Sequence, residues 1–182
     1  MRLTNKRFEK KLLSLWIQRE SILFTEDNAV EVINYGLYNI KDIYFEHFRS
    51  DYFTDNKYEN RPHYCTFTDK KGIIWFIPLS TQTEAYAEKI RKDEEKHGSC
   101  LFYHIGKING INRVFLIGNM FPVTADYIKK PYVIGNTHYV VGNKELIKQI
   151  HKKAVRYLTL VEYKKLKPKV DIMKIKSVLY KR

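Results

Sequence analysis

Two polar side chains at the start of a predicted strand have the chemistry needed to act on a phosphodiester. In the segment NRPHYCTF, Arg61 and His63 stand two positions apart, so on a strand both side chains project from the same face. The guanidinium supplies a fixed positive charge for developing negative charge, and the imidazole titrates near neutral pH. A structural interpretation also stands, in which Arg61 completes a turn and His63 is a half-buried, hydrogen-bonded ring.

A second candidate pair consists of adjacent hydroxyls. Ser80 and Thr81 follow the apolar run WFIPL and precede a helical pattern. The order Thr-Gln-Thr-Glu from Thr81 to Glu84 matches a capping box, in which the hydroxyl accepts an amide hydrogen bond and the acid reaches back. Capping uses one hydroxyl and leaves Ser80 over. A helix N-terminus with free amides and hydroxyls is also a phosphate site, so the sequence leaves both functions open.

A predicted hairpin carries both pairs. PHYCTFT and IIWFIPL, residues 62–68 and 73–79, are expected strands, and the turn DKKG joins them. These neighbouring strands would bring the Arg–His pair towards the two hydroxyls. We expect this approach only if the strand ends wrap around a bent sheet.

The remaining pattern predicts an α+β domain over residues 1–182, built on a small, strongly bent antiparallel sheet with helices around it. The other predicted elements are an amphipathic helix over 6–23, irregular aromatic-rich turns over 35–60, a helix over 83–97 closed by Gly98, strands over 100–106 and 113–118 around Asn109-Gly110, short strands and a short helix opened by Thr124 over 119–141, a helix over 143–163, and a last short helix over 172–179 after a break at Pro168.

Positive charge is concentrated near the end of the sequence. The net charge is +13, and residues 144–182 contain 13 Lys and Arg side chains against 3 acids. A localised basic surface suits a polyanion, because each neutralised phosphate releases condensed counterions. A lysine-rich soluble surface is the simpler alternative. Membrane binding is less favoured, because no exposed aromatic face accompanies the basic segments.

Several classes of chemistry lack their sequence signals. The histidines and the two cysteines show no HxH, HExxH or CxxC spacing, and no P-loop, dinucleotide fingerprint or G-x-S-x-G elbow occurs. We therefore expect no metal and no cofactor. No run of about 18 apolar residues or signal-peptide pattern is present, which predicts a cytoplasmic protein. In that compartment Cys65 and Cys100 are expected as reduced, buried thiols.

Three segments, in this order, resemble a known family. NRPHYCTF, WFIPLSTQTEAY and FLIGNMFPVTADYI resemble the blocks of the type III toxin–antitoxin toxins, the ToxN/CptN/TenpN-like endoribonucleases, with the CptN-like branch nearest. The match covers roughly residues 38–161, which leaves 1–35 as an N-terminal helical extension before a core over 36–182. The family is similar in fold to the MazF and Kid toxins. The resemblance thus implies a compact, strongly twisted antiparallel sheet or half-barrel with peripheral helices.

The resemblance also implies an activity and partners. It implies metal-independent cleavage of single-stranded RNA, cellular mRNA included, in which the 2′-OH attacks the adjacent phosphate and leaves a 2′,3′-cyclic phosphate and a 5′-OH. It implies a repeated small RNA pseudoknot as antitoxin, which the toxin cuts from a precursor and holds in a closed protein–RNA hetero-oligomer. A role in phage defence accompanies such systems.

Carried over by position, the family's hydroxyl pair corresponds to Ser80 and Thr81, and its basic residue after the first-strand proline corresponds to His63, where some relatives have lysine. We expect His63 as base or acid, Arg61 on the phosphorane charge, and the hydroxyls on the phosphate oxygens. Aromatic residues of 35–64 are candidates for base stacking or for the core. The candidate RNA-binding residues are Lys144, Lys148, Lys152, Lys153, Arg156, Lys164 and Lys165.

Two other classes of function compete with the endoribonuclease. A non-catalytic RNA-binding or structural protein on the same fold would share its charge and its core. A DNA-binding regulator ranks lower, because the sequence has no helix-turn-helix signature.

Overall fold

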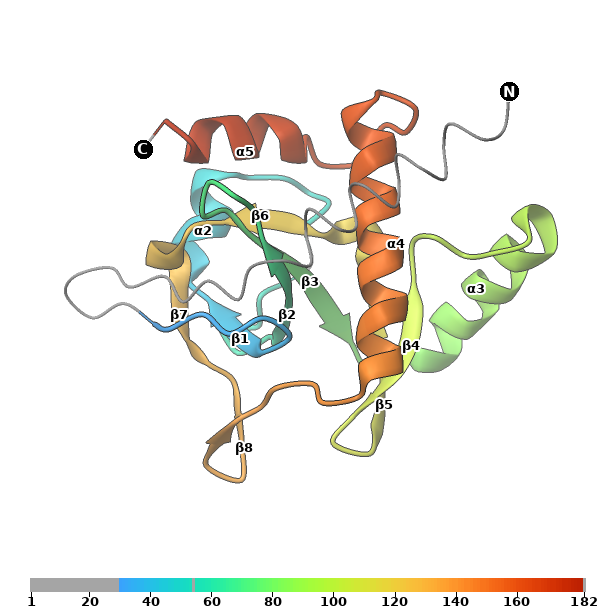
Figure 1. The fold of residues 1–182 in the computed structure, drawn as a ribbon, viewed down its shortest axis with the longest axis horizontal. Helices are drawn as coiled ribbons and strands as arrows, with labels where there is room; N and C mark the ends of the chain where they lie inside the picture. Colours follow the sequence, from blue (N-terminus) through green and yellow to red (C-terminus); the bar gives the residue numbers. More distant parts are fainter. Residues whose placement is uncertain (1–29, 54, 182) are drawn as a thin grey trace.

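The computed structural model describes residues 30–53 and 55–181. The predicted helix over 6–23, with most of the N-terminal extension, lies outside this range. The elements of the described chain (Figure 1) are β1 (Leu37–Ile40), α2 (Asp42–His47), β2 (His63–Thr68), β3 (Ile74–Ser80), α3 (Thr83–His97), β4 (His104–Ile108), β5 (Ile111–Phe115), the 3-10 turn η1 (Ile117–Asn119), β6 (Phe121–Val123), the 3-10 turn η2 (Ala125–Tyr127), β7 (Ile128–Pro131), β8 (Val133–Ile134), β9 (Thr137–His138), α4 (Lys144–Glu162) and α5 (Ile172–Leu179).

One seven-stranded sheet organises these elements and confirms the predicted α+β class. Its strand order is β4-β5-β3-β2-β1-β7, with β6 also paired to β3. Every strand pair of the sheet in the described chain is antiparallel. The hairpin between β4 and β5 turns at Asn109-Gly110, and both residues have positive φ, 48° and 77°. This is the backbone that the Asn-Gly pair favours in a tight hairpin.

Strand β3 pairs with two different strands on one side, and the change occurs near a proline, Pro78. Leu79 and Ser80 pair with β5, whereas Ile74 to Phe76 pair with β6. Between them lies η1, across from Pro78, which has no amide hydrogen to donate to the ladder. The Pro78 carbonyl still accepts the Leu116 amide at 3.0 Å. The sheet therefore changes neighbours along β3, close to the strand end that carries the candidate hydroxyls.

Helices cover the sheet unequally. In Figure 1, α4 runs across the sheet and α5 lies over one end of it. Six side chains of α4 are buried, at the spacing that the sequence predicts for one apolar face: Leu146, Ile150, Ala154, Tyr157, Leu158 and Val161. By contrast α3 projects to one side and has no buried residue. Strands β2 and β3 are buried on both faces, which puts them at the centre of the core.

Some local predictions differ from the structure. The segment expected as irregular over 35–60 contains β1 and α2, which are too short for a clear periodic signal. Its aromatic residues do pack together, with Tyr44 fully buried and its ring 5.2 Å from that of Phe121. Helix α4 does match its prediction, because it runs from Lys144 to Glu162, within one residue of 143–163 at each end, and Lys164 takes a left-handed conformation just after it. Both cysteines are free and buried, as predicted.

Candidate functional site

The register of the β2–β3 hairpin places Arg61 beside Ser80. His63 pairs with Pro78, and the amide of the next residue, Leu79, donates to the carbonyl just before β2 at 3.3 Å. Because the strands are antiparallel, the residues that precede β2 lie against the residues that end β3. The approach of Arg61 to the hydroxyl pair therefore follows from the hairpin register, and it does not need the strand ends to wrap around the sheet.

The Arg61 side chain is fixed by backbone carbonyls. Its Nη1 donates to the Leu79 carbonyl at 2.8 Å, and its Nε donates to the Asp55 carbonyl. Desolvation lowers the pKa of the guanidinium, and the nearby Asp55 and Tyr86 offset part of that effect. The buried Asn39 amide donates to the Arg61 carbonyl at 3.4 Å. A guanidinium has five N–H donors, so donors remain for a ligand. The sequence pattern gives no signal for Asp55 or Asn39, which act on Arg61 through backbone carbonyls.

The hydroxyl pair lies at the start of α3. Neither hydroxyl caps the helix in the way that the sequence predicts. The residue before the helix is Gln82, and its side chain makes no capping hydrogen bond. Ser80 Oγ accepts the Gln82 amide at 3.2 Å, and the Thr81 carbonyl accepts the Thr83 amide at 2.9 Å. These turns replace the capping box expected from Thr81 to Glu84. Ser80 is half-buried and Thr81 is exposed, so both can meet a ligand at this helix start.

His63 follows Arg61 by two positions in the sequence. Its ring, however, does not lie at the surface that carries the Ser80 and Thr81 hydroxyls. Its side chain has no exposed area. The ring stacks on Phe45 at 6.1 Å and meets the Phe121 ring edge-on at 5.4 Å, between centroids. Neither ring nitrogen has a hydrogen-bond partner. Desolvation, with the Arg61 charge, lowers the imidazole pKa to about 3, although the backbone of Arg61 and Tyr38 offsets part of the shift.

The environment of His63 differs from both interpretations of the sequence, a catalytic group on the same face as Arg61 and a half-buried, hydrogen-bonded ring. The sequence places Arg61 and His63 two apart on one strand face, but Arg61 lies before β2 and stays half-exposed, with its guanidinium bonded to backbone carbonyls. A neutral ring enclosed by aromatic side chains does not contact an RNA phosphate in this conformation. The signal that would separate the two residues is the burial of both faces of β2, which depends on the rest of the fold.

Next to Arg61 lies a feature without a sequence signal. Lys57, Tyr58 and Glu59 have successive positive φ values of 52°, 53° and 62°. The left-handed conformation costs a residue with a β-carbon about 1–2 kcal/mol and normally occurs at single positions. Asn, Asp and Gly favour it, and none of the three residues is of these types. We call residues 56–60 the left-handed turn.

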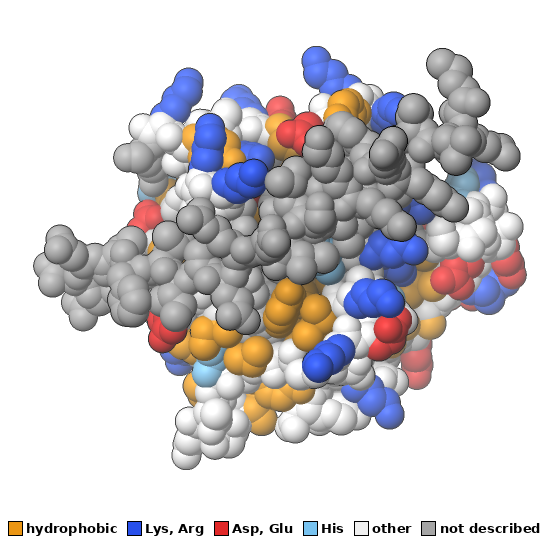
Figure 2. Space-filling view, in the orientation of Figure 1, with side chains coloured by type: hydrophobic (Ala, Val, Ile, Leu, Met, Phe, Trp, Pro, Cys, Tyr) orange, Lys and Arg blue, Asp and Glu red, His pale blue; other side chains and the backbone are white. Residues whose placement is uncertain are grey.

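The predicted RNA-binding residues lie along α4 and just after it. Lys144, Lys148, Lys152 and Arg156 are exposed and recur every four residues, about 6 Å apart along the helix axis. No carboxylate of the described chain forms an ion pair with these four side chains. Figure 2 shows Lys and Arg side chains gathered over α4. We call these four residues the basic row.

The other predicted basic residues differ in exposure. Lys164 and Lys165 are exposed beyond the end of α4. Lys153 is half-buried, and its Nζ donates to the Tyr103 carbonyl at 2.9 Å. Desolvation also lowers the pKa of that ammonium. Lys153 is thus bound to the protein itself, unlike the basic row.

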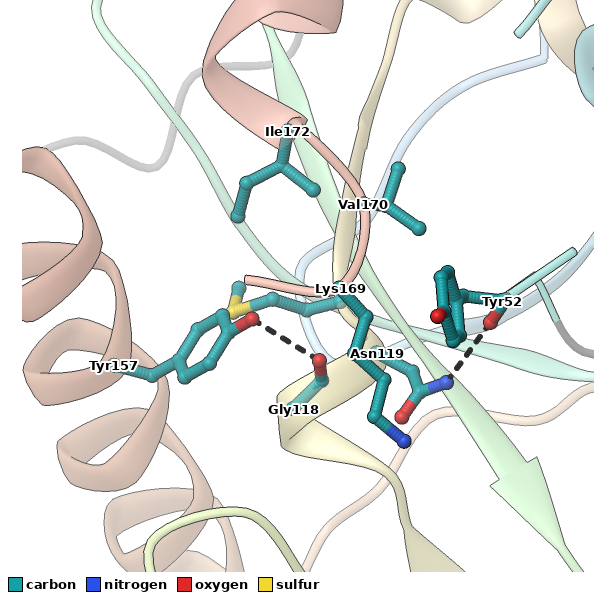
Figure 3. Close-up of a pocket in the computed structure, with 8 residues that line it drawn as sticks. Tyr52, Gly118, Asn119, Tyr157, Lys169, Val170 and Ile172 are labelled. Atoms are coloured by element: carbon teal, nitrogen blue, oxygen red, sulfur yellow. Dashed lines mark hydrogen bonds between the residues drawn. The ribbon is translucent and has the colours of Figure 1, made fainter. Parts of the chain in front are cut away.

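A small cavity lies apart from the hairpin, between α4, η1 and the chain before α5 (Figure 3). Its volume is about 10 Å³, which is room for one water molecule. Around it, the Tyr157 hydroxyl donates to the Gly118 carbonyl at 3.0 Å, and the Asn119 amide donates to the Tyr52 carbonyl at 3.3 Å. The cavity is too small for a nucleobase, and these bonds give it a structural role.

The described part of the chain has neither a cluster of metal-ligand side chains nor a membrane-spanning helix. Residues 30–53 and 55–181 contain no group of three or more His, Cys, Asp or Glu side chains arranged to hold a metal ion. In the same part of the chain, no helix combines the length and the apolar character that crossing a bilayer requires.

Comparison with known proteins gives a similarity in fold. The sequence matches no model of a known protein family and no curated protein. Among solved structures, the chain is similar to AbiQ, described as a lactococcal anti-phage endoribonuclease belonging to the type III toxin–antitoxin system. The TM-score is 0.56 at 16% sequence identity, over 80% of this chain and 97% of that chain. At this identity the likeness shows the fold, and it does not distinguish the CptN-like branch.

Proposed function

We propose that this protein is the toxin of a type III toxin–antitoxin system, an endoribonuclease that cleaves single-stranded RNA in the cytoplasm. One observation carries the proposal: an anchored guanidinium, Arg61, lies beside Ser80 and Thr81 at a helix start that no side chain caps. Cationic and hydroxyl donors at a helix N-terminus suit a phosphate group. The AbiQ-like fold supports the class of enzyme, and the order of the three sequence blocks supports the CptN-like branch.

The proposed reaction is an in-line attack of the ribose 2′-OH on the adjacent phosphorus. The 2′-oxygen bonds to phosphorus as the bond from phosphorus to the 5′-oxygen breaks. The 2′-OH proton passes to solvent water, and water protonates the departing 5′-oxygen, which leaves a 2′,3′-cyclic phosphate and a 5′-OH. Arg61 stabilises the charge on the phosphorane, and the Ser80 and Thr81 hydroxyls hold its oxygens. None of these steps requires a metal. His63 lies buried at the start of β2, with its ring packed against Phe45 and Phe121. An acid–base role for His63 would require the aromatic residues around it to move aside.

The proposed partner is an antitoxin RNA of repeated pseudoknots, which the toxin processes and holds in a closed hetero-oligomer. The unpaired positive charges of the basic row, with Lys164 and Lys165, support a folded polyanion as partner. The sequence also proposed Lys153, and its bond to the Tyr103 carbonyl makes it the least available of the set. Cellular and phage mRNA would meet the hydroxyl pair when the antitoxin is absent.

The test compares wild-type protein with Ser80→Ala and Thr81→Val on total cellular RNA, with and without a chelator. We expect the wild type to cleave in both conditions and to leave 5′-OH ends that polynucleotide kinase labels directly. Each variant should lose about 10²- to 10³-fold in rate, the usual loss for one phosphate donor. Thr137→Val, at an exposed threonine of β9, is the control and should cleave normally. Equal cleavage by all four proteins would refute the site.

One observation favours a second candidate, a non-catalytic RNA-binding protein. Arg61, Ser80 and Thr81 include no group that titrates near neutral pH, and the nearby His63 is buried. If the wild-type protein binds RNA through the basic row and cleaves none under any ionic condition, this second function holds.

A further inference from the structure

Tyr58 is a large apolar side chain with almost no contact to its own protein. It is 90% exposed, and the other exposed large hydrophobic side chains of the described chain reach at most 56%. The aromatic neighbours in the same stretch, Tyr44, Phe45 and Phe53, pack against one another with centroids 5.1 to 6.1 Å apart. The core therefore explains those rings and leaves Tyr58 without a structural role.

The left-handed turn forces Tyr58 outward. Three successive residues with β-carbons in this conformation persist only where the surroundings enforce it. Here the Asn56 carbonyl accepts the amides of Asn60 and Arg61, both at 3.1 Å. The Asn56 amide in turn donates to the Ile40 carbonyl at 2.8 Å. The turn is thus fastened to the end of β1, in the buried part of the protein.

A second anchor holds the other side of the turn. One Glu59 carboxylate oxygen accepts the Asp42 amide at 2.7 Å, and the other forms an ion pair with Lys129 on β7. These contacts lower the pKa of the Glu59 carboxyl, with the Lys129 contact as the largest cause. Lys57 and Glu59, which flank Tyr58, therefore both have a strained backbone, and the Glu59 side chain is held by two contacts. The Tyr58 ring between them remains in solvent.

The same turn also holds Arg61. The Arg61 amide closes the turn on Asn56, and its Nε donates to the Asp55 carbonyl at the turn entrance. The exposed ring of Tyr58 and the guanidinium of Arg61 therefore belong to one braced segment, three positions apart in the sequence. An aromatic face beside a fixed cation matches a nucleotide, because the ring can stack on a base while the cation meets a phosphate.

We propose that Tyr58 is a base-stacking residue, which positions a nucleotide of single-stranded RNA so that its phosphate reaches Arg61 and the hydroxyl pair. This inference rests on the proposed endoribonuclease function and adds a substrate contact to it. Stacking on one aromatic ring tolerates every base, so Tyr58 holds the RNA without selecting its sequence. Because the turn is already rigid, RNA binding does not have to order it and loses no conformational entropy there. The strained backbone thereby favours binding.

The test uses four variants on single-stranded RNA of randomised sequence that carries scattered 2-aminopurine, whose fluorescence is quenched on stacking. Tyr58→Ala should lower cleavage and binding by roughly 5- to 150-fold, the usual effect of one stacked base. Tyr58→Phe should retain both, because stacking needs the ring and not the hydroxyl. Tyr58→Gly should lose cleavage like Tyr58→Ala while its melting temperature stays at or above that of wild type, because glycine accepts positive φ without strain. Tyr163→Ala, at an exposed tyrosine beyond α4, is the matched control and should behave as wild type.

The outcomes separate this inference from the function on which it rests. Cleavage and quenching that survive in Tyr58→Ala would overturn the stacking role while the endoribonuclease stands. Loss of cleavage in Tyr58→Phe would overturn it too, because the hydroxyl would then act in the chemistry. A wild type that never cleaves, yet binds RNA with quenching that requires the ring, would reject the enzyme and support the stacking. Absence of both cleavage and binding would refute both.

Discussion

His63 should make the stability of this protein fall steeply in mild acid, and phenylalanine in its place should remove much of that loss. Burial holds the imidazole pKa at about 3 in the folded protein, whereas an unfolded chain gives it about 6.5. Between these values the unfolded state binds a proton that the folded state does not bind. The free energy of unfolding therefore decreases as the pH falls below about 6.5, and the decrease continues towards pH 3.

The size of the effect follows from the same values. At about 1.4 kcal/mol per pH unit, His63 alone costs about 2 kcal/mol between pH 6.5 and pH 5. For a chain of this size, that corresponds to roughly 4–8 °C in melting temperature. Replacement by phenylalanine removes two ring nitrogens that have no hydrogen-bond partner of normal geometry, although the backbone of Arg61 and Tyr38 acts on the imidazole pKa. The new ring would pack against Phe45 and Phe121, so we expect the stability at pH 7 to stay within about 1.5 kcal/mol of wild type.

The assay is thermal unfolding of wild type and His63→Phe at pH 7 and pH 5. The difference in melting temperature between the two pH values should be smaller in the variant by the amount above. Other histidines with lowered pKa values, such as His104 at about 4, remain in both proteins and cancel in the comparison. His97→Gln, at an exposed histidine of α3, should change nothing. Equal acid sensitivity in wild type and His63→Phe would refute the reasoning.

The same variant tests catalysis. Since the His63 ring has no exposed area, the structure predicts that His63→Phe still cleaves RNA. A stable, folded variant without cleavage would restore the acid–base role that the sequence suggests for this histidine.

Three further predictions follow from individual contacts. Arg61→Lys should lower RNA cleavage at least tenfold in a rate assay, because an ammonium cannot bridge two carbonyls and still offer a planar pair of donors to phosphate. Lys148→Gln and Lys152→Gln should weaken RNA binding in a salt titration, each reducing the slope of log K against log salt by about 0.7; an unchanged slope would exclude the basic row as the binding surface. Tyr180→Phe removes the hydroxyl bond to the Asp69 carboxylate that fastens the end of α5 to the β2–β3 turn, and urea unfolding should show a loss of about 1.5–3 kcal/mol.

The sequence by itself determined the elements that local pattern encodes. The β2–β3 hairpin, the Asn109-Gly110 turn, α3 with its Gly98 end and the buried face of α4 all follow from short-range periodicity or turn chemistry. These patterns act within a few residues, so no distant contact is needed to read them. The α+β class follows from their order along the chain. The approach of Arg61 to Ser80 and Thr81 could also be predicted from the sequence, because the turn of a hairpin fixes the register of its two strands.

Only the tertiary structure decided which of these side chains meet solvent. His63 and Arg61 look equivalent in the sequence, yet Phe45 of α2 and Phe121 of β6 pack against the first, while the second lies before β2 and stays half-exposed. The positive φ values around Tyr58 are enforced by bonds to β1, α2 and β7, which lie far from it in the sequence. Burial and strain depend on what covers a residue and what holds it. Both are properties of the assembled fold, and no local pattern contains them.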